Sequence, residues 1–170
     1  MSFAGCWTPA GKETMLNLEI PGYPTLNLRH LVLDYNGTLA VDGRLVDGAG
    51  QLLTRLSADL DIHVVTADTF GKVREGMTGV PCTVSVLPAG DQDQAKLDYI
   101  NRLGSTQTVC MGNGRNDRLM LKAAGLGVAV ILEEGAAVET LLAADVVCHT
   151  IVDALQLLRQ PLRLTATLRS

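Results

Sequence analysis

Polar residues that can carry chemistry stand at the ends of three apolar runs of this chain. Asp34 to Thr38 (DYNGT) follows the run 30–33, Thr66 to Asp68 (TAD) follows 62–65, and Gly112 to Asp117 (GNGRND) follows 108–111. Lys96 lies between the second and third groups. A carboxylate, a hydroxyl, an ammonium group and a loop of Asn and Asp residues are together typical of phosphoryl transfer.

The carboxylate of Asp34 can attack phosphorus and form an aspartyl phosphate. The phosphoryl oxygens then need hydrogen-bond donors and cations, which Thr66 and Lys96 can supply. Oxygen ligands on neighbouring loops suit Mg²⁺, which takes one or two carboxylates together with waters and phosphate. The residue types therefore predict a Mg²⁺-dependent site, provided that the fold brings the groups together.

An alternation of strand-like and helix-like segments predicts a fold that brings these groups together. Short apolar runs predict strands at 30–33, 62–65, 82–87, 108–111, 127–132 and 145–148. The leucine spacing of 49–60 predicts an amphipathic helix, and further helices are expected between the strands at 69–77, 91–103, 115–124, 135–143 and 151–159. Such repeated units form an α/β fold with a mostly parallel, doubly wound sheet, which binds ligands at the carboxyl ends of its strands.

Local signals predict where two of these helices begin and end. Asp47 is a candidate cap for the helix 49–60. Asp91 and Asp93 are expected to open the helix that carries Lys96, and Gly104 is expected to close it.

The residues before the first strand of the sheet predict an extension and a hairpin. Residues 1–14 have no periodicity and suggest a flexible extension, so the folded unit is expected to be one domain over 15–170, with its core over about 30–160. Two alternating segments, 15–20 and 25–29, flank the turn-forming PGYP and predict a β-hairpin. We expect this hairpin to cover a sheet edge or to form an oligomer contact.

Composition narrows the classes of protein. The chain has 170 residues, 47% of them hydrophobic and 4% aromatic, and a net charge of −4. Its densest basic group, Arg115, Arg118 and Lys122, is interpreted as a solvated helix face, so no nucleic-acid partner is expected. No run approaches the roughly 18 apolar residues that span a bilayer. Its four cysteines form no CxxC pair, which favours free thiols and a cytoplasmic protein.

In their order along the chain, the polar groups resemble the four motifs of the haloacid dehalogenase superfamily. DYNGTLA is similar to motif I (D-x-D-G-T), VVTAD to motif II, Lys96 to motif III, and GNGRND to motif IV (G-D-G-x-N-D). The pattern is most similar to soluble proteins that resemble the phosphorylation domain of P-type ATPases. The resemblance implies a Rossmann-like three-layer sandwich over about residues 30–160.

The resemblance also implies a role for each residue that matches a motif. Asp34 would be the nucleophile and a Mg²⁺ ligand, with the backbone carbonyl of Asn36 as a second ligand. The phosphoryl group would contact Thr66, Ala67, Lys96 and Tyr35, and the remaining metal positions would be Asn113 and Asp117. The supporting positions would be Gly37, Thr38, Gly112, Gly114 and Asn116.

Two positions that are usually aspartate in this superfamily are asparagine here. Asn36 cannot protonate a leaving group or activate water, a contribution of about 10²- to 10⁴-fold. Asn113 offers Mg²⁺ an oxygen but no charge. The sequence therefore predicts a slow phosphohydrolase that prefers activated substrates such as acyl or aryl phosphates. The alternative is a module that binds a phosphorylated ligand or docks on a partner without turnover.

The spacing of the motifs leaves no room for a cap domain. Only 31 residues separate Asp34 from Thr66 (66 − 34 − 1), and 29 separate Thr66 from Lys96 (96 − 66 − 1). An uncapped site implies either a macromolecular substrate or an oligomer in which a neighbouring subunit covers the site, with the hairpin as a candidate lid. Acidic charge and small size favour a phosphorylated small molecule.

Plainer explanations exist for several of these residues. Asp34 can cap a strand end, Thr66 can be an ordinary turn residue, and Lys96 can be an exposed helix lysine. Asp68 is expected to cap the following helix. The three histidines, His30, His63 and His149, are expected to be isolated structural residues.

Overall fold

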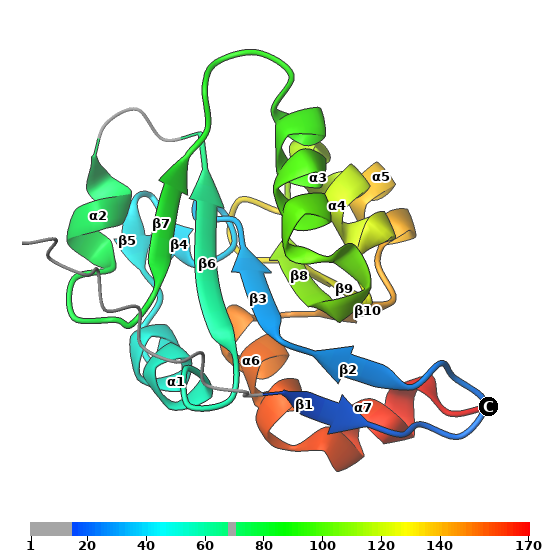
Figure 1. The fold of residues 1–170 in the computed structure, drawn as a ribbon. Coiled ribbons are helices and arrows are strands. Elements are labelled where there is room, and N and C mark those ends of the chain that lie inside the picture. The colour runs from blue at the N-terminus through cyan, green and yellow to red at the C-terminus, as the bar shows by residue number, and fades with distance from the viewer. Residues whose placement is uncertain (1–14, 68–70) are drawn as a thin grey trace, which may run out of the picture.

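A computed structural model describes residues 15–67 and 71–170 of the chain (Figure 1). Its centre is a six-stranded parallel sheet in the order β10-β9-β8-β3-β6-β7. These strands are β3 (His30–Leu33), β6 (Asp61–Thr66), β7 (Thr83–Val86), β8 (Thr108–Gly112), β9 (Leu126–Val130) and β10 (Val146–Cys148). The predicted α/β class, the parallel sheet and all six predicted strands are confirmed.

Helices cover both faces of this sheet, as the repeated strand–helix units predict. One face carries α1 (Ala49–Leu56), α2 (Lys72–Gly76), α6 (Ile151–Arg159) and α7 (Pro161–Leu168). The other carries α3 (Gln92–Leu103), α4 (Arg118–Ala123) and α5 (Val138–Ala143) (Figure 1). Two short 3₁₀ helices, η1 (Ser105–Gln107) and η2 (Arg115–Asp117), precede β8 and α4. In the described part of the chain, no helix has the length and apolar character needed to cross a membrane.

Side-chain alternation along the strands divides the core between these two faces. Leu31 and Leu33 of β3 pack with the α1 and α6 side, whereas Val32 packs with the α3 and α4 side. Strands that are buried on both faces are continuously apolar, and β8 and β9 are buried at every position.

The predicted N-terminal hairpin is confirmed, but its predicted place at a sheet edge is wrong. Strands β1 (Leu16–Leu18) and β2 (Leu26–Leu28) pair antiparallel, and β2 leads directly into the central strand β3. The sheet edges are β7 and β10. The hairpin instead lies beyond the amino end of β3 beside α7 (Figure 1), where Ser170 N donates to Pro21 O at 3.1 Å. Buried leucines of both elements explain this position, and α7 itself was not predicted.

A second hairpin, also not predicted, follows the motif I segment. Strands β4 (Ala40–Val41) and β5 (Arg44–Leu45) pair through a two-residue turn. Asp42 and Gly43 both have positive φ, at 49° and 79°, which is the conformation of a type I′ turn and suits an Asp-Gly sequence. We call residues 40–45 the flap.

Most helix boundaries differ from the prediction by a few residues. The expected cap Asp47 is wrong, because Gly48 precedes α1 in a left-handed conformation with φ of 85° and no side chain caps the helix. Asp91 and Gly104 do flank α3, as predicted. Asp68 and the expected start of a helix at 69 lie outside the described residues, as do residues 1–14.

The described residues between the motifs form no cap domain. The flap, α1 and β6 occupy the chain between Asp34 and Thr66, and α2, β7 and the start of α3 lie between Thr66 and Lys96. The carboxyl edge of the sheet is therefore not covered by an inserted domain of this chain among the residues described.

Two of the histidines are partners, so the prediction that all three are isolated is wrong. His30 Nδ1 lies 3.2 Å from His63 Nε2, and His63 Nδ1 lies 2.9 Å from the hydroxyl of Tyr99 on α3. Adjacent parallel strands bring them together. His63 of β6 is level with Val32 of β3, which is two residues after His30 and therefore on the same face of the sheet. Burial, followed by the neighbouring His30, lowers the pKa of His63 to about 4.

This pairing predicts a loss of stability at acidic pH. An unfolded histidine has a pKa near 6.5, so the folded state resists protonation of His63 and loses stability as pH falls from 6.5 towards 4. After allowance for solvent screening of a partly exposed ring, the loss is about 1 to 2 kcal/mol. Urea unfolding at pH 7.5 and 4.5 should show a smaller acid loss in His63→Gln than in wild type. An equal loss in both would contradict this assignment, and His149→Gln, at an exposed position, is the control.

Candidate active site

The predicted site residues meet at the carboxyl edge of the sheet, around its central strands. Leu33 of β3 is level with Val64 of β6 and Met111 of β8, and the chain leaves each strand within two or three residues. The strand order reverses between β3 and β8, since β6 and β7 lie on one side and β9 and β10 on the other (Figure 1). Such a switch point is where doubly wound sheets bind ligands.

Lys96 is the centre of the charge arrangement. Its side chain is 0% exposed, and its Nζ donates to Asp34 Oδ1 at 2.8 Å and to Asp117 Oδ1 at 2.6 Å. A third, longer contact of 3.4 Å reaches Asn116 Oδ1. Because α3 turns this position towards the sheet, the alternative of an exposed helix lysine is wrong, and Lys96 joins motif I to motif IV.

Burial and shared charge shift the titration of this group. Burial, followed by the charge of Asp117, raises the pKa of Asp34 to about 7, although Lys96 opposes the shift. Burial disfavours the ammonium of Lys96, but the two carboxylates outweigh it and raise its pKa. One buried cation between two carboxylates therefore leaves an excess of negative charge on the Asp34 side, which an incoming cation can neutralise.

Asp117 holds the motif IV loop together with Lys96. Its Oδ2 accepts hydrogen bonds from the backbone N–H groups of Asn113 at 3.0 Å and Gly114 at 2.9 Å, while its Oδ1 accepts from Lys96. Both oxygens of this predicted metal ligand are thus engaged within the protein. The fully buried carboxylate fixes the loop that presents Asn113.

Asn113 faces motif I, as predicted, and its amide has two partners. The hydroxyl of Thr38 donates to Asn113 Oδ1 at 3.2 Å and lies 3.5 Å from Asp34 Oδ2. Asn113 Nδ2 donates to the carbonyl oxygen of Gly135 at 3.0 Å. The oxygens of Asp34 and Asn113 therefore converge on one hydroxyl group.

Two glycines allow this close approach. Gly37 has φ of 77°, and a side chain there would overlap the amide of Asn113. A side chain at Gly112 would overlap the carboxylate of Asp117. Both glycines were predicted as supporting positions. The structure shows what they allow: without side chains here, the motif I and motif IV loops can pack directly against their neighbours.

The remaining predicted residues occupy different surroundings. Thr66 is buried at the end of β6, and Ala67 is partly exposed just after it. The ring of Tyr35 lies in the core beneath the flap, with its hydroxyl 3.4 Å from Gly43 O, while its backbone N–H bonds the carboxylate of Asp34. Any contact of Tyr35 with a phosphoryl group is thus restricted to its backbone. Asn36 is exposed, and none of the described residues hydrogen-bonds its side chain.

Three further residues belong to the site although no motif indicated them. Gln92 Oε1 accepts from Asn116 Nδ2 at 3.0 Å, and the Thr140 hydroxyl donates to Gly114 O at 2.6 Å. Gly135 is the partner of Asn113 already described. In the sequence, Gln92 and Gly135 stand at predicted helix starts and Thr140 lies inside a predicted helix, and such positions are too common to identify a site residue.

Oxygen donors at this edge fit a small hard cation. The carboxylate of Asp34 and Asn113 Oδ1 face the same Thr38 hydroxyl group, and the backbone carbonyl of Asn36 belongs to the same loop as Asp34. Among the described residues, no three His, Cys, Asp or Glu side chains form a metal cluster. The donor set is therefore one carboxylate with neutral oxygens, which suits Mg²⁺ completed by water and excludes a thiolate or imidazole site here.

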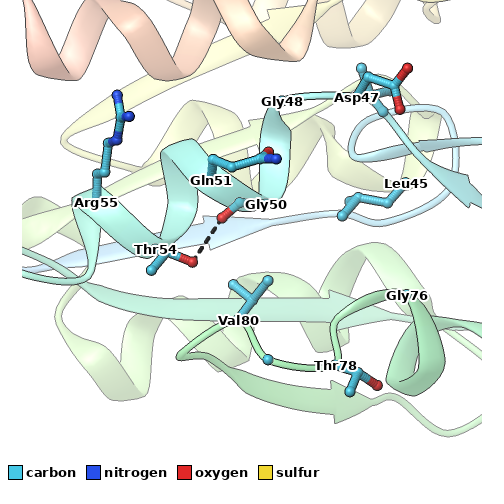
Figure 2. Close-up of a pocket in the computed structure, with 12 residues that line it drawn as sticks. Leu45, Asp47, Gly48, Gly50, Gln51, Thr54, Arg55, Gly76, Thr78 and Val80 are labelled. Carbon is cyan, nitrogen blue, oxygen red and sulfur yellow. Dashed lines mark hydrogen bonds between the residues drawn. The ribbon is translucent and has the colours of Figure 1, made fainter.

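Two hollows border the end of the flap and share Leu45, Val46 and Asp47 in their linings. One, of about 450 Å³, lies between the flap and the segments after β9 and β10, with Arg44, Leu132 and His149 among its lining residues. The other, of about 590 Å³, lies between α1 and the turn after α2, where Figure 2 shows Thr54 of α1 and Val80 of the turn on facing sides. None of the predicted site residues lines either hollow, but the first adjoins the carboxyl edge.

Known proteins share this sequence and fold to different extents. No family model matches the chain. Uncharacterized protein MJ0073 of Methanocaldococcus jannaschii is 43% identical over 84 residues, which are 47% of this chain and 90% of that protein. Uncharacterized protein MJ0072 of the same organism is 41% identical over 39 residues, which are 23% of this chain and 89% of that protein.

Solved structures of haloacid dehalogenase hydrolases share the fold. A 3-deoxy-D-manno-octulosonate 8-phosphate phosphatase from Moraxella catarrhalis, in complex with magnesium, phosphate and KDO, has a TM-score of 0.65 at 14% identity and covers 78% of this chain and 86% of its own. A cobalt-bound deoxy-D-mannose-octulosonate 8-phosphate phosphatase from Haemophilus influenzae has a TM-score of 0.65 at 16% identity and covers 84% of this chain and 94% of its own. A putative hydrolase of subfamily III A from Legionella pneumophila has a TM-score of 0.67 at 19% identity, covering 83% and 87%.

The shared cation predicts that Lys96→Met is strongly destabilising. The substitution leaves Asp34 and Asp117 buried without their common partner, and removing one member of a buried pair costs about 3 to 5 kcal/mol. Urea unfolding at pH 7.5 should show this loss, whereas Lys122→Met, at an exposed helix position, should change stability by less than about 0.5 kcal/mol. Equal stability of the two variants would show that Lys96 does not neutralise the pair.

Proposed function

Because this chain belongs to the same family as the Methanocaldococcus jannaschii protein MJ0073 and has the haloacid dehalogenase fold, we propose that it is a Mg²⁺-dependent phosphohydrolase with an aspartyl-phosphate intermediate at Asp34. The observation that carries the proposal is the buried Lys96 bridging Asp34 and Asp117 at the switch point of the sheet. A neighbour in fold that is named a phosphatase was solved with magnesium and phosphate, which supports the same chemistry.

Asp34 is the proposed nucleophile. Lys96 holds Oδ1 at 2.8 Å, so Oδ2 is the oxygen that attacks phosphorus. A bond forms between Oδ2 and phosphorus while the bond from phosphorus to the leaving oxygen breaks, and the leaving group departs with the electron pair. Water then attacks the aspartyl phosphate, which regenerates the carboxylate and releases inorganic phosphate.

The neighbouring groups neutralise and orient this chemistry. Lys96 balances the charge that develops on the phosphoryl oxygens, and we assign Thr66 and the backbone of Tyr35 and Ala67 as their hydrogen-bond donors. Asp34, the carbonyl of Asn36 and Asn113 Oδ1 would hold Mg²⁺, which supplies charge neutralisation when bound. Asp117 acts on this arrangement indirectly, because both its oxygens hold Lys96 and the motif IV loop.

Asn36 limits the rate of this reaction. Its exposed amide stands where an acid would protonate the leaving oxygen and later activate water, and an amide does neither. Leaving groups that need no proton, such as carboxylates and phenolates, are therefore favoured. Hydrolysis of the intermediate also slows, a property expected of the P-type-ATPase-like subfamily to which we assign the chain.

The open carboxyl edge bears on the substrate. We propose a phosphorylated small molecule in the cytoplasm, with the hollow of about 450 Å³ beside the flap as room for its leaving group. A neighbouring subunit of a homo-oligomer is a candidate lid. The hairpin 15–29 lies at the opposite end of β3 from Asp34, so it can serve only the site of another copy.

A non-catalytic function is the second candidate. Asn36 removes the titratable group from the mouth of the site, and burial together with the charge of Asp117 raises the pKa of Asp34, which favours its protonated, non-nucleophilic form. Such a site would bind phosphate or a phosphorylated ligand without turnover. Mg²⁺-dependent binding of a beryllofluoride phosphate mimic without phosphate release would support this function.

The decisive prediction concerns Asn36→Asp. Restoring an acid at this position should raise Mg²⁺-dependent phosphate release about 10²-fold or more, because general acid–base catalysis is regained. Release from acetyl phosphate and from an aryl phosphate is measured in freshly purified protein, with the larger gain on the substrate with the poorer leaving group.

Asp34→Asn is the control for this experiment. It should abolish release in both the wild-type and the Asn36→Asp background, because the nucleophile is lost. If wild type and Asn36→Asp are both inert while folded and saturated with Mg²⁺, the phosphohydrolase is excluded and the binding function takes its place.

A further inference from the structure

The segment after β9 is fastened to the motif IV loop by four hydrogen bonds. Ala137 N donates to Asn113 O at 2.9 Å, and Asn113 Nδ2 donates to Gly135 O at 3.0 Å. The Thr140 hydroxyl donates to Gly114 O at 2.6 Å, and Arg115 Nε donates to Glu139 at 3.0 Å. The loop that completes the site is thus held from outside by residues 135–140.

The Asn113 side chain connects this attachment to motif I. Its Oδ1 accepts from Thr38 at 3.2 Å, and its Nδ2 donates to Gly135 O. One planar amide therefore joins three segments that are far apart in the sequence. Asn113 is only 7% exposed, so water has little room to replace either of these hydrogen bonds.

A carboxylate cannot make both of these contacts. Its second oxygen would face the carbonyl oxygen of Gly135, and two acceptors about 3 Å apart with no proton between them repel each other. Reversing the amide would create the same conflict, so the orientation of Asn113 is fixed by Gly135. Gly37 lies so close to the amide of Asn113 that even a Cβ atom there would overlap it, which leaves little room for a shift towards motif I.

We propose that Asn113 is a positioning residue that cross-links motif I, motif IV and the 135–140 segment, a role that aspartate cannot fill. The asparagine at this position is then required by the fold, whereas the exposed Asn36 alone keeps turnover slow. The cross-link stands on the geometry of the described residues, and its consequence for turnover rests on the phosphohydrolase proposed above.

Amide hydrogen exchange without metal tests the cross-link directly. Asn113→Asp and Asn113→Leu should each accelerate exchange at the Ala137 and Thr140 amides by about tenfold or more and lower the Tm, because both lose the donor to Gly135. Asn36→Asp is the matched control: it adds the same charge at an exposed position without a described side-chain partner, so exchange at these amides should stay as in wild type.

Three results would overturn the cross-link. Asn113→Asp could keep wild-type exchange and Tm, which would show that a carboxylate fills the role. Asn113→Leu could keep them while Asn113→Asp does not, which would assign the effect to charge alone. Asn36→Asp could accelerate exchange equally, which would show a general response of the site to charge.

Phosphate release by the same variants tests the consequence for turnover. With Mg²⁺ and acetyl phosphate, Asn36→Asp should exceed wild type, and Asn113→Asp should fall below it with a larger loss in kcat than in KM. Faster release by Asn113→Asp would contradict the assigned role of Asn113. Absence of release in every variant, with the exchange results as expected, would exclude the phosphohydrolase and leave the cross-link established.

Discussion

One buried cation is the constraint on which the rest of the site depends. Lys96 lies fully buried between Asp34 and Asp117, and removing either kind of charge would leave the other in a low-dielectric interior. The helix α3 must therefore dock against both β3 and the loop after β8. Ion pairing of Asp93 with Arg118 at 2.7 Å fastens the same helix to the start of α4, so the position of Lys96 is fixed from two sides.

The two asparagines of the motifs differ in their surroundings, although the sequence presents them alike. Asn36 points from an exposed loop, and Asn113 lies buried with partners at both ends of its amide. The first places an amide, which does not titrate, at an exposed position of the motif I loop. The second supplies a hydrogen-bond donor inside the site. Two residues that look equivalent in the sequence thus have different surroundings in the fold.

Short-range patterns predicted which segments form helices and strands more reliably than which of these elements lie next to one another. Leucine periodicity identified α1, but the cap is Gly48 in place of Asp47, because the chain leaves the flap through a left-handed residue. The hairpin at 15–29 formed as predicted, yet it covers the amino end of β3 and not an edge. His30 and His63 are 33 positions apart and became partners only because their strands are adjacent. Propensity acts over a few residues, whereas these outcomes depend on which elements meet.

The sequence by itself determined the fold class, the six strands of the sheet and the meeting of Asp34, Thr66 and Asn113 at its carboxyl edge. Alternation and motif order suffice for these, because parallel strands place their ends on one side. Only the tertiary structure decided that Lys96 is buried between two carboxylates, that both oxygens of Asp117 are engaged, and that Gln92, Gly135 and Thr140 belong to the site. Those facts are properties of side-chain packing between distant segments, and local sequence carries no record of which distant atom completes a hydrogen bond.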